Sequence, residues 1–152
     1  MSTKILMVCL GNICRSPLAE GILSSKVDPE DIEVDSAGTA GYHIGKAPDH
    51  RSIAVAKRYG IDISKQRCRQ FSQEDFNNFD IIYAMDRSNY HNILTLAKDK
   101  GDIEKVKLLL EVTALGITEV PDPYYDQDEG FEKVFHMIDI ACDSIAKQLK
   151  TD

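Results

Sequence analysis

The stretch ILMVCLGNICRSPLAEGIL, residues 5–23, begins as an apolar run, crosses a short loop with a cysteine at each end, and finishes with an amphipathic pattern. Residues 4–9, KILMVC, are a short apolar run bounded by turn residues, which is typical of a central strand covered on both faces. After the loop, apolar residues recur at the spacing of one helix face: Leu18, Ala19, Ile22 and Leu23. The stretch therefore predicts the first strand and the first helix of an α/β protein.

The rest of the chain repeats this alternation of strands and helices. Residues 31–38, 80–86 and 105–110 predict three more strands, and an apolar cluster predicts a helix that ends near Gly60. The last helix has the clearest apolar stripe, at spacings of three and four: Phe131, Val134, Phe135, Ile138, Cys142, Ile145 and Leu149. We therefore expect one domain over residues 1–152, a three-layer α/β fold with a roughly four-stranded parallel sheet and helices on both faces.

Length and composition restrict the class of protein. With 152 residues, 43% of them hydrophobic, the chain can bury a core without a disulfide or a metal. It shows neither a signal peptide nor an apolar run long enough to cross a bilayer, so we expect a cytoplasmic protein. The net charge of −7 disfavours nucleic-acid binding. The cysteines lack the spacing of a zinc site, so we expect four free thiols: Cys9, Cys14, Cys68 and Cys142. We predict no metal and no cofactor.

The loop of residues 9–16 leaves the first strand at the sheet edge where open α/β folds bind ligands. Ser16 is a good N-cap and Pro17 suits a first helical turn, so this loop leads into a helix N-terminus. Gly11 and Asn12 tolerate left-handed backbone and can curl the preceding amides towards the same point. The Gly-Lys-Ser/Thr ending of a nucleotide-binding loop is absent. We predict an oxyanion site made by Leu10, Gly11, Asn12, Ile13, Cys14, Arg15 and Ser16.

Cys9 and Arg15 at the two ends of this loop point to phosphoryl transfer. A thiolate under a ring of N–H groups and beside a guanidinium is stabilised, so that Cys9 can act as a nucleophile. Arg15 offers a planar fork that can hold two phosphoryl oxygens, and Ser16 can donate a hydrogen bond to the thiolate. The combination predicts a covalent phosphocysteine, formed without a metal ion.

A phosphate ester also needs a proton for its leaving oxygen. The segment EVPDPYYDQDEGF, residues 119–131, is an acidic, turn-rich loop before the last helix, and it can return to the same sheet edge. Asp122 lies between two prolines and is our candidate for the acid. Tyr124 and Tyr125 can wall the cleft and stack on an aromatic leaving group. A carboxyl beside apolar rings can remain protonated long enough to donate.

These segments together resemble the low molecular weight protein tyrosine phosphatases. The resemblance rests on VCLGNICRSP and DPYY, and extends through DSAGTAGYHIGKAPD at 35–49 and RQFSQEDFNNFDIIYAMDRSN at 69–89. It covers nearly the whole chain, and is far more specific than a lone Cys-x5-Arg pattern. It implies the phosphotyrosine phosphatase fold and the hydrolysis of phosphotyrosine and small aryl phosphates, the latter being an acid phosphatase activity.

The resemblance also implies roles for single residues. Cys9 is then the nucleophile, Arg15 the phosphate clamp, and Asp122 the general acid and afterwards the base. Support of the loop falls to Asn12, Ser16 and Ser36. The rim that meets the substrate consists of Tyr42, Tyr124 and Tyr125.

Cys14 has two possible roles. By resemblance it is the second loop thiol, which can trap oxidised Cys9 in a reversible disulfide. The alternative is a small residue that only packs the loop. Asp86, at the end of the third predicted strand, is likewise expected either to cap the next helix or to orient residues of the site.

One position departs from the family pattern. Many members carry a histidine, linked to the loop asparagine, where SKQRCRQ in this chain offers Gln66 or Lys65. Glutamine can still form a hydrogen bond with an amide, so we expect a change in the pKa of the Cys9 thiol and no loss of activity.

Three other functions share such a loop. An arsenate reductase needs a relay pair of cysteines, but Cys68 has no such neighbour and Cys142 lies in the last helix. A phosphoarginine phosphatase has a threonine where this chain has Ile13, which leaves less room for a planar guanidinium. A silent anion-binding module would leave Asp122 without a function. We therefore expect phosphotyrosine-containing proteins as substrates, and a monomer with at most weak self-association.

Overall fold

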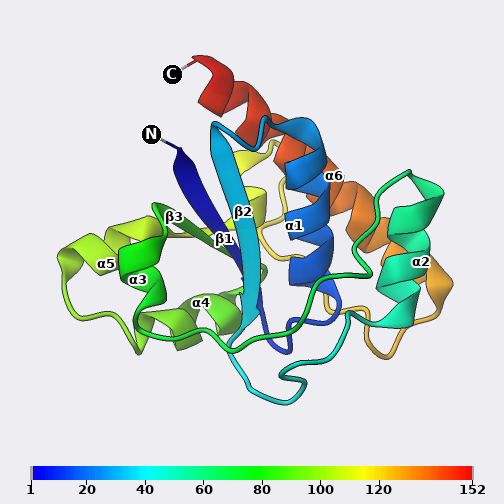
Figure 1. The fold of residues 1–152 in the computed structure, drawn as a ribbon, viewed down its shortest axis with the longest axis horizontal. Helices are drawn as coiled ribbons and strands as arrows, with labels where there is room; N and C mark the ends of the chain where they lie inside the picture. The colour runs from blue at the N-terminus through cyan, green and yellow to red at the C-terminus, as the bar shows by residue number, and fades with distance from the viewer. Residues whose placement is uncertain (1, 152) are drawn as a thin grey trace.

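The computed structural model, which describes residues 2–151, contains a parallel four-stranded sheet between two layers of helices (Figure 1). The strands follow the order β2-β1-β3-β4 across the sheet. Their bounds are Thr3–Cys9 for β1, Ile32–Gly38 for β2, Ile81–Ala84 for β3 and Val106–Leu108 for β4. This arrangement confirms the predicted α/β fold with four parallel strands.

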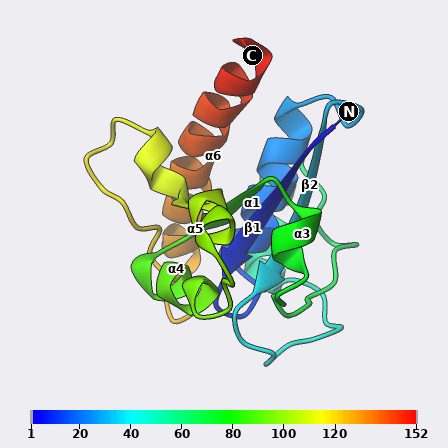
Figure 2. The same ribbon diagram turned by 90° about the vertical axis from the view of Figure 1, so that its left-hand side faces the viewer.

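Helices cover both faces of the sheet (Figures 1 and 2). One face carries α1 (Arg15–Lys26), α2 (His50–Arg58) and α6 (Asp128–Thr151). The other side carries α3 (Asp75–Asn78), α4 (Arg87–Leu94) and α5 (Lys100–Lys105). Within residues 2–151, none of the helices has both the length and the apolar character that a membrane span requires.

The central strand β1 serves both layers of the core. Ile5 and Met7 are fully buried in the cluster formed with α1, α2 and α6. Leu6 and Val8 are fully buried in the cluster on the opposite face, with α3 and α4. Successive side chains of a strand point to opposite faces, so a strand between two helical layers must be apolar throughout.

The sheet order places the end of β1 at a topological switch point. From β1 the chain passes through α1 to β2 on one side, while β3 pairs with β1 on the other side. The loop after β1 and the segment after β3 therefore meet at one edge, where ligands bind in such sheets. Figure 1 shows this edge at the lower end of the molecule, away from both termini.

The fourth strand is shorter than predicted. The run expected at residues 105–110 pairs with β3 only at Val106–Leu108, and it continues as the 3-10 helix η1, Leu109–Val112. Leu109 and Leu110 are adjacent, yet both are fully buried in the cluster with α6. A strand would send them to opposite faces, so the chain leaves the strand to bury both on one side.

Candidate active site

The loop after β1 bonds its carbonyl groups to the surrounding structure and leaves its amides free. The carbonyls at positions 9, 10, 12, 13 and 14 accept hydrogen bonds of 2.8–3.2 Å from the Thr39 N–H, the Ala40 N–H, the Cys68 thiol, the Asp49 N–H and the Ser52 hydroxyl, respectively. None of the N–H groups of residues 10–14 donates a hydrogen bond within the described part of the chain. Free amides gathered in one loop at a helix N-terminus form an anion site.

Asn12 holds the shape of this loop. It is 2% exposed and has a φ of 59°, in the left-handed region that asparagine tolerates better than most residues. Its Nδ2 donates to the hydroxyls of Ser16 at 2.8 Å and Ser36 at 3.0 Å, and its Oδ1 accepts from the Arg69 N–H at 3.0 Å. The side chain therefore ties the loop to α1, to β2 and to the segment before α3.

Ser16 does not cap α1, contrary to our expectation. The helix begins at Arg15, and Cys14 occupies the N-cap position without a capping hydrogen bond from its side chain. The Ser16 hydroxyl instead lies 3.0 Å from the Cys9 sulfur and accepts a hydrogen bond from Asn12. A side-chain cap would occupy one of the amides that an anion needs, so the hydroxyl is used for the thiol and the helix end stays open.

Arg15 is fixed by partners from two other segments, the turn after β3 and the loop before α6. Its Nη1 donates to the Asp86 carboxylate at 2.6 Å and to the Val120 carbonyl at 2.9 Å, while its Nη2 lies 3.8 Å from the Asp122 carboxylate. Although burial opposes its charge, Cys9 and Asp86 raise the pKa of Arg15. The guanidinium therefore stays charged with its Nη2 side towards the cleft.

Asp86 fulfils both of its possible roles. One oxygen accepts the hydrogen bond from Arg15, and the other accepts from the Asn89 N–H at 2.8 Å and so caps α4. The same carboxylate thus joins the first turn of α4 to the Arg15 guanidinium.

Asp122 lies across the cleft from the loop. Its side chain is 45% exposed, and one carboxylate oxygen accepts a hydrogen bond from the Tyr124 N–H at 3.1 Å. The cleft, of about 310 Å³, is lined by the loop together with Asp122 and the three tyrosines predicted for the rim: Tyr42, Tyr124 and Tyr125. The structure therefore brings the predicted thiol, guanidinium, carboxyl and aromatic groups to one cavity.

Cys14 lines the same cleft but is only 4% exposed. Burial raises the pKa of its thiol, and the charges of Asp49 and Cys9 act in the same direction, so Cys14 stays protonated near neutral pH. Cys142 is fully buried in the core, as its place in the stripe of the last helix predicts. All four cysteines are free thiols.

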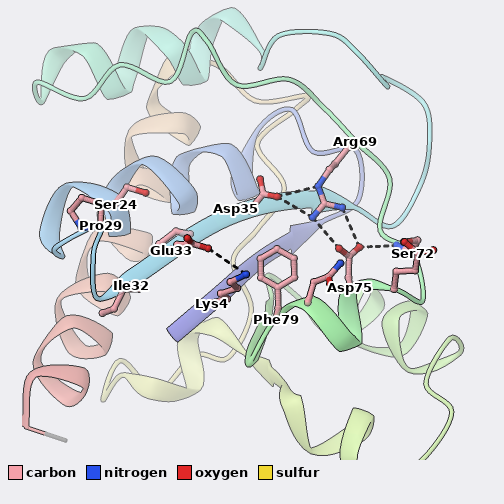
Figure 3. Close-up of a pocket in the computed structure, with 13 residues that line it drawn as sticks. Lys4, Ser24, Pro29, Ile32, Glu33, Asp35, Arg69, Ser72, Asp75 and Phe79 are labelled. Atoms are coloured by element: carbon pink, nitrogen blue, oxygen red, sulfur yellow. Dashed lines mark hydrogen bonds and ion pairs between the residues drawn. The ribbon is translucent and has the colours of Figure 1, made fainter. Parts of the chain in front are cut away.

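Gln66 does not replace the family histidine as a partner of Asn12. Its amide donates to the Pro17 carbonyl at 3.1 Å, whereas Asn12 is held by the Arg69 backbone. Figure 3 shows how Arg69 is fixed: its guanidinium lies between Asp35 and Asp75, at 3.1 Å from each carboxylate. Asp35, Arg69 and Asp75 line a larger hollow of about 650 Å³ beside β2 and α3. This hollow is separate from the cleft at Cys9.

Several residues near the site had no signal of their own in the sequence. Glu20 of α1 accepts a hydrogen bond from the Ser36 hydroxyl at 2.7 Å, and burial raises its pKa to about 7. His43 lies so close over the loop that a Cβ on Gly11 would come within 3.1 Å of its ring. Arg51 spans from α2 to the Asp122 loop. The partners of Glu20 and Arg51 lie far from them in the sequence, so residue type and spacing alone do not indicate these contacts.

Comparison with known proteins agrees with this geometry. A model of the family "Low molecular weight phosphotyrosine protein phosphatase" matches residues 4–152. The phosphatase of that name from Schizosaccharomyces pombe is 43% identical, covering 84% of this chain and 85% of its own, and that of Homo sapiens is 40% identical, covering 91% and 90%. A crystal structure of a protein tyrosine phosphatase from Entamoeba histolytica superposes with a TM-score of 0.93 at 37% identity, covering 99% of this chain and 98% of its own. The resemblance seen in the sequence is thereby confirmed, and the chain is an enzyme of the low molecular weight phosphotyrosine protein phosphatase family.

Proposed function

We propose that this enzyme hydrolyses phosphotyrosine in proteins through a phosphocysteine intermediate on Cys9. The observation that carries the proposal is the loop of free amides around Cys9, which faces Arg15 and Asp122 in one cleft. The fission yeast and human relatives are named as phosphotyrosine protein phosphatases, which supports the same substrate here.

In the first step, the Cys9 thiolate attacks the phosphorus and the ester P–O bond breaks. The loop amides and the Arg15 guanidinium hold the equatorial oxygens, whose charge must be stabilised in the transition state. Asp122 gives its proton to the leaving phenolate oxygen. The products of this step are free tyrosine on the peptide and a phosphoryl group on the sulfur of Cys9.

In the second step, Asp122, now a carboxylate, takes a proton from a water molecule. The resulting hydroxide attacks the phosphorus, the P–S bond breaks, and inorganic phosphate leaves while Cys9 returns as a thiolate. Ser16, 3.0 Å from the sulfur and oriented by Asn12, stabilises the thiolate as it departs.

The shape of the cleft favours a phenyl ring next to the phosphate. Ile13 of the loop lines the cleft, and Tyr124 and Tyr125 lie at its mouth with exposed fractions of 39% and 95%. These apolar and aromatic surfaces suit the flat face of phosphotyrosine. We also propose that the protein is cytoplasmic and is a monomer with at most weak self-association.

Cys14 is the proposed redox partner of Cys9. A peroxide would oxidise the Cys9 thiolate to a sulfenic acid, and the Cys14 thiol would then form a disulfide with loss of water. A dithiol would restore both thiols, and the disulfide would protect the nucleophile from further oxidation.

Phosphate release from a phosphotyrosine peptide in the presence of EDTA tests the proposal. We expect phosphate release by the wild type and complete loss of release in Cys9→Ser. The control Cys142→Ala should retain activity, because Cys142 lies in the core and does not line the cleft. Phosphoserine and phosphoarginine peptides are assayed alongside. Faster release from phosphoarginine would contradict the proposed substrate, and undiminished release by Cys9→Ser would contradict the mechanism.

The role of Asp122 has its own test. Asp122→Asn should lower kcat/KM about 100-fold or more for phenyl phosphate, whose leaving oxygen needs a proton. The loss should be much smaller for 2,4-dinitrophenyl phosphate, whose leaving group departs without one. Equal losses on the two substrates would refute Asp122 as the acid.

A further inference from the structure

Arg51, in the first turn of α2, reaches across to the loop that carries Asp122. Its Nη2 donates to the Tyr124 carbonyl at 2.9 Å, and its Nη1 donates to the Asp126 carbonyl at 3.1 Å. The guanidinium carbon lies 4.5 Å from the centre of the Phe131 ring, within the range of a cation–π contact. One planar group thus holds the backbone of this loop on the C-terminal side of Asp122.

Asp49 connects the same guanidinium to the loop of residues 9–16, which we call the phosphate loop. Its carboxylate accepts from the Nε and the Nη2 of Arg51, both at 3.0 Å, and its N–H donates to the Ile13 carbonyl at 2.8 Å. The Asp49 side chain is 8% exposed and that of Arg51 is 24% exposed. Although burial opposes ionisation, the hydrogen bonds from Arg51 lower the pKa of Asp49. The pair therefore stays charged at neutral pH.

The contacts form a continuous path from the phosphate loop to Asp122. Ile13 bonds to Asp49, Asp49 bonds to Arg51, and Arg51 bonds to the Tyr124 carbonyl. The N–H of Tyr124 in turn donates to the Asp122 carboxylate at 3.1 Å.

The other side of the Asp122 loop is anchored separately. The Val120 N–H donates to the Met85 carbonyl at 2.8 Å, and the Val120 carbonyl accepts from Arg15 at 2.9 Å. Asp122 thus lies between two anchors. A general acid must lie within hydrogen-bonding distance of the leaving oxygen. Both anchors therefore affect the distance between Asp122 and that oxygen.

We propose that the Asp49–Arg51 pair is a positioning strut that sets the distance between the phosphate loop and Asp122. Arg51 lies outside the catalytic cleft and acts through the backbone of Tyr124 and Asp126. This inference rests on the proposed function of Asp122 as the acid.

The test compares two α2 arginines. Arg51→Met keeps an unbranched side chain against Phe131 but removes the donors. Arg58→Met is the matched control, because Arg58 pairs at 2.7 Å with Glu132 of α6 and not with the Asp122 loop. For each variant, kcat/KM is measured with phenyl phosphate and with 2,4-dinitrophenyl phosphate, which differ chiefly in the basicity of the leaving oxygen.

We expect Arg51→Met to lower kcat/KM about 10-fold or more for phenyl phosphate and by less than about 2-fold for the activated ester. Arg51→Lys should recover part of the loss, because an ammonium can still donate to one carbonyl. Asp49→Asn, which retains an acceptor for the α2 cap, should show the same leaving-group pattern. The double variant should be no worse than the more damaged single variant, because the two residues act as one unit.

Equal losses of Arg51→Met on both esters would overturn the strut, since they indicate damage to the phosphate loop or to folding. Unchanged activity on both would overturn it as well. If Asp122→Asn shows the leaving-group pattern and Arg51→Met does not, the strut alone is wrong. If Asp122→Asn does not show it, the acid role fails, and the strut fails with it.

Discussion

Gly38, the last residue of β2, sets how closely the sheet approaches the loop that follows β1. A Cβ at this position would lie 2.8 Å from the Leu10 carbonyl oxygen and 3.0 Å from the Asn12 nitrogen. Both are backbone atoms of the loop, which cannot move aside as the end of a side chain can. Glycine is required here because only its backbone fits.

Gly38→Ala should therefore displace the loop and lower kcat/KM on a phosphotyrosine peptide about 100-fold, the cost expected for a shift near 1 Å in a catalytic group. Gly101→Ala in α5 is the control, because its Cβ would meet only the end of the Asp99 side chain, at 3.2 Å. Activity of Gly38→Ala close to that of the control would show that the loop tolerates the displacement.

At the residue scale, the sequence predicts those groups whose chemistry is unusual at their position. A cysteine and an arginine bracketing a glycine-containing loop, and an aspartate between two prolines, stand out without a structure. Glu20 and Arg51 do not, because a charged residue on a helix has the same appearance whether it meets solvent or a loop from elsewhere in the chain. Their partners, Ser36 and Tyr124, are brought to them only by the tertiary fold.

Among the elements, α4 depends on one carboxylate for two contacts. Asp86 caps the helix through Asn89 and also pairs with Arg15, whose side chain is 3% exposed. Asp86→Asn keeps an acceptor for the cap and loses the charge, whereas Asp86→Ala loses both. We expect Ala to lower the free energy of unfolding more than Asn, by about 0.5–2 kcal/mol, which is the usual value of an N-cap.

Urea unfolding of the two Asp86 variants, compared with the wild type, measures this difference. Both variants should be less stable than the wild type, because they remove the nearer of the two carboxylates that compensate the buried charge of Arg15. Equal stability of Asn and Ala would mean that the cap contributes nothing to α4.

Element boundaries show where sequence patterns lose their meaning. The apolar run of β1 is a strand for its whole length, because both of its faces are covered. A similar run at residues 105–110 divides into β4 and η1, because two adjacent leucines bury on one side. A continuous apolar run predicts burial, but it does not distinguish a strand from a tight helical turn.

At the scale of the whole molecule, Glu20 makes folding sensitive to pH. Its pKa is raised from 4.5 to about 7 by burial, so between these values the folded protein holds a proton that the unfolded chain releases. This contribution to stability is complete below the unfolded pKa and is lost as the pH rises through the folded pKa. The slope for one such group is at most about 1.4 kcal/mol per pH unit.

Glu20→Gln should remove this dependence, because glutamine is neutral at every pH and still accepts a hydrogen bond from Ser36. We expect the variant to gain stability relative to the wild type between about pH 5 and about pH 8, as measured by urea unfolding at several pH values. Parallel pH profiles for the two proteins would show that Glu20 does not titrate in this range.

The central claim, covalent catalysis by Cys9, is tested most directly by trapping the phosphoenzyme. The wild type is mixed with a peptide whose phosphotyrosine carries a radiolabelled phosphate, and the reaction is quenched during turnover. The enzyme is then digested, and mass spectrometry locates the residue that carries the label. We predict phosphate on Cys9 in the wild type and none in Cys9→Ser. Continued phosphate release with no label on Cys9, or with the label on another residue, would contradict the account.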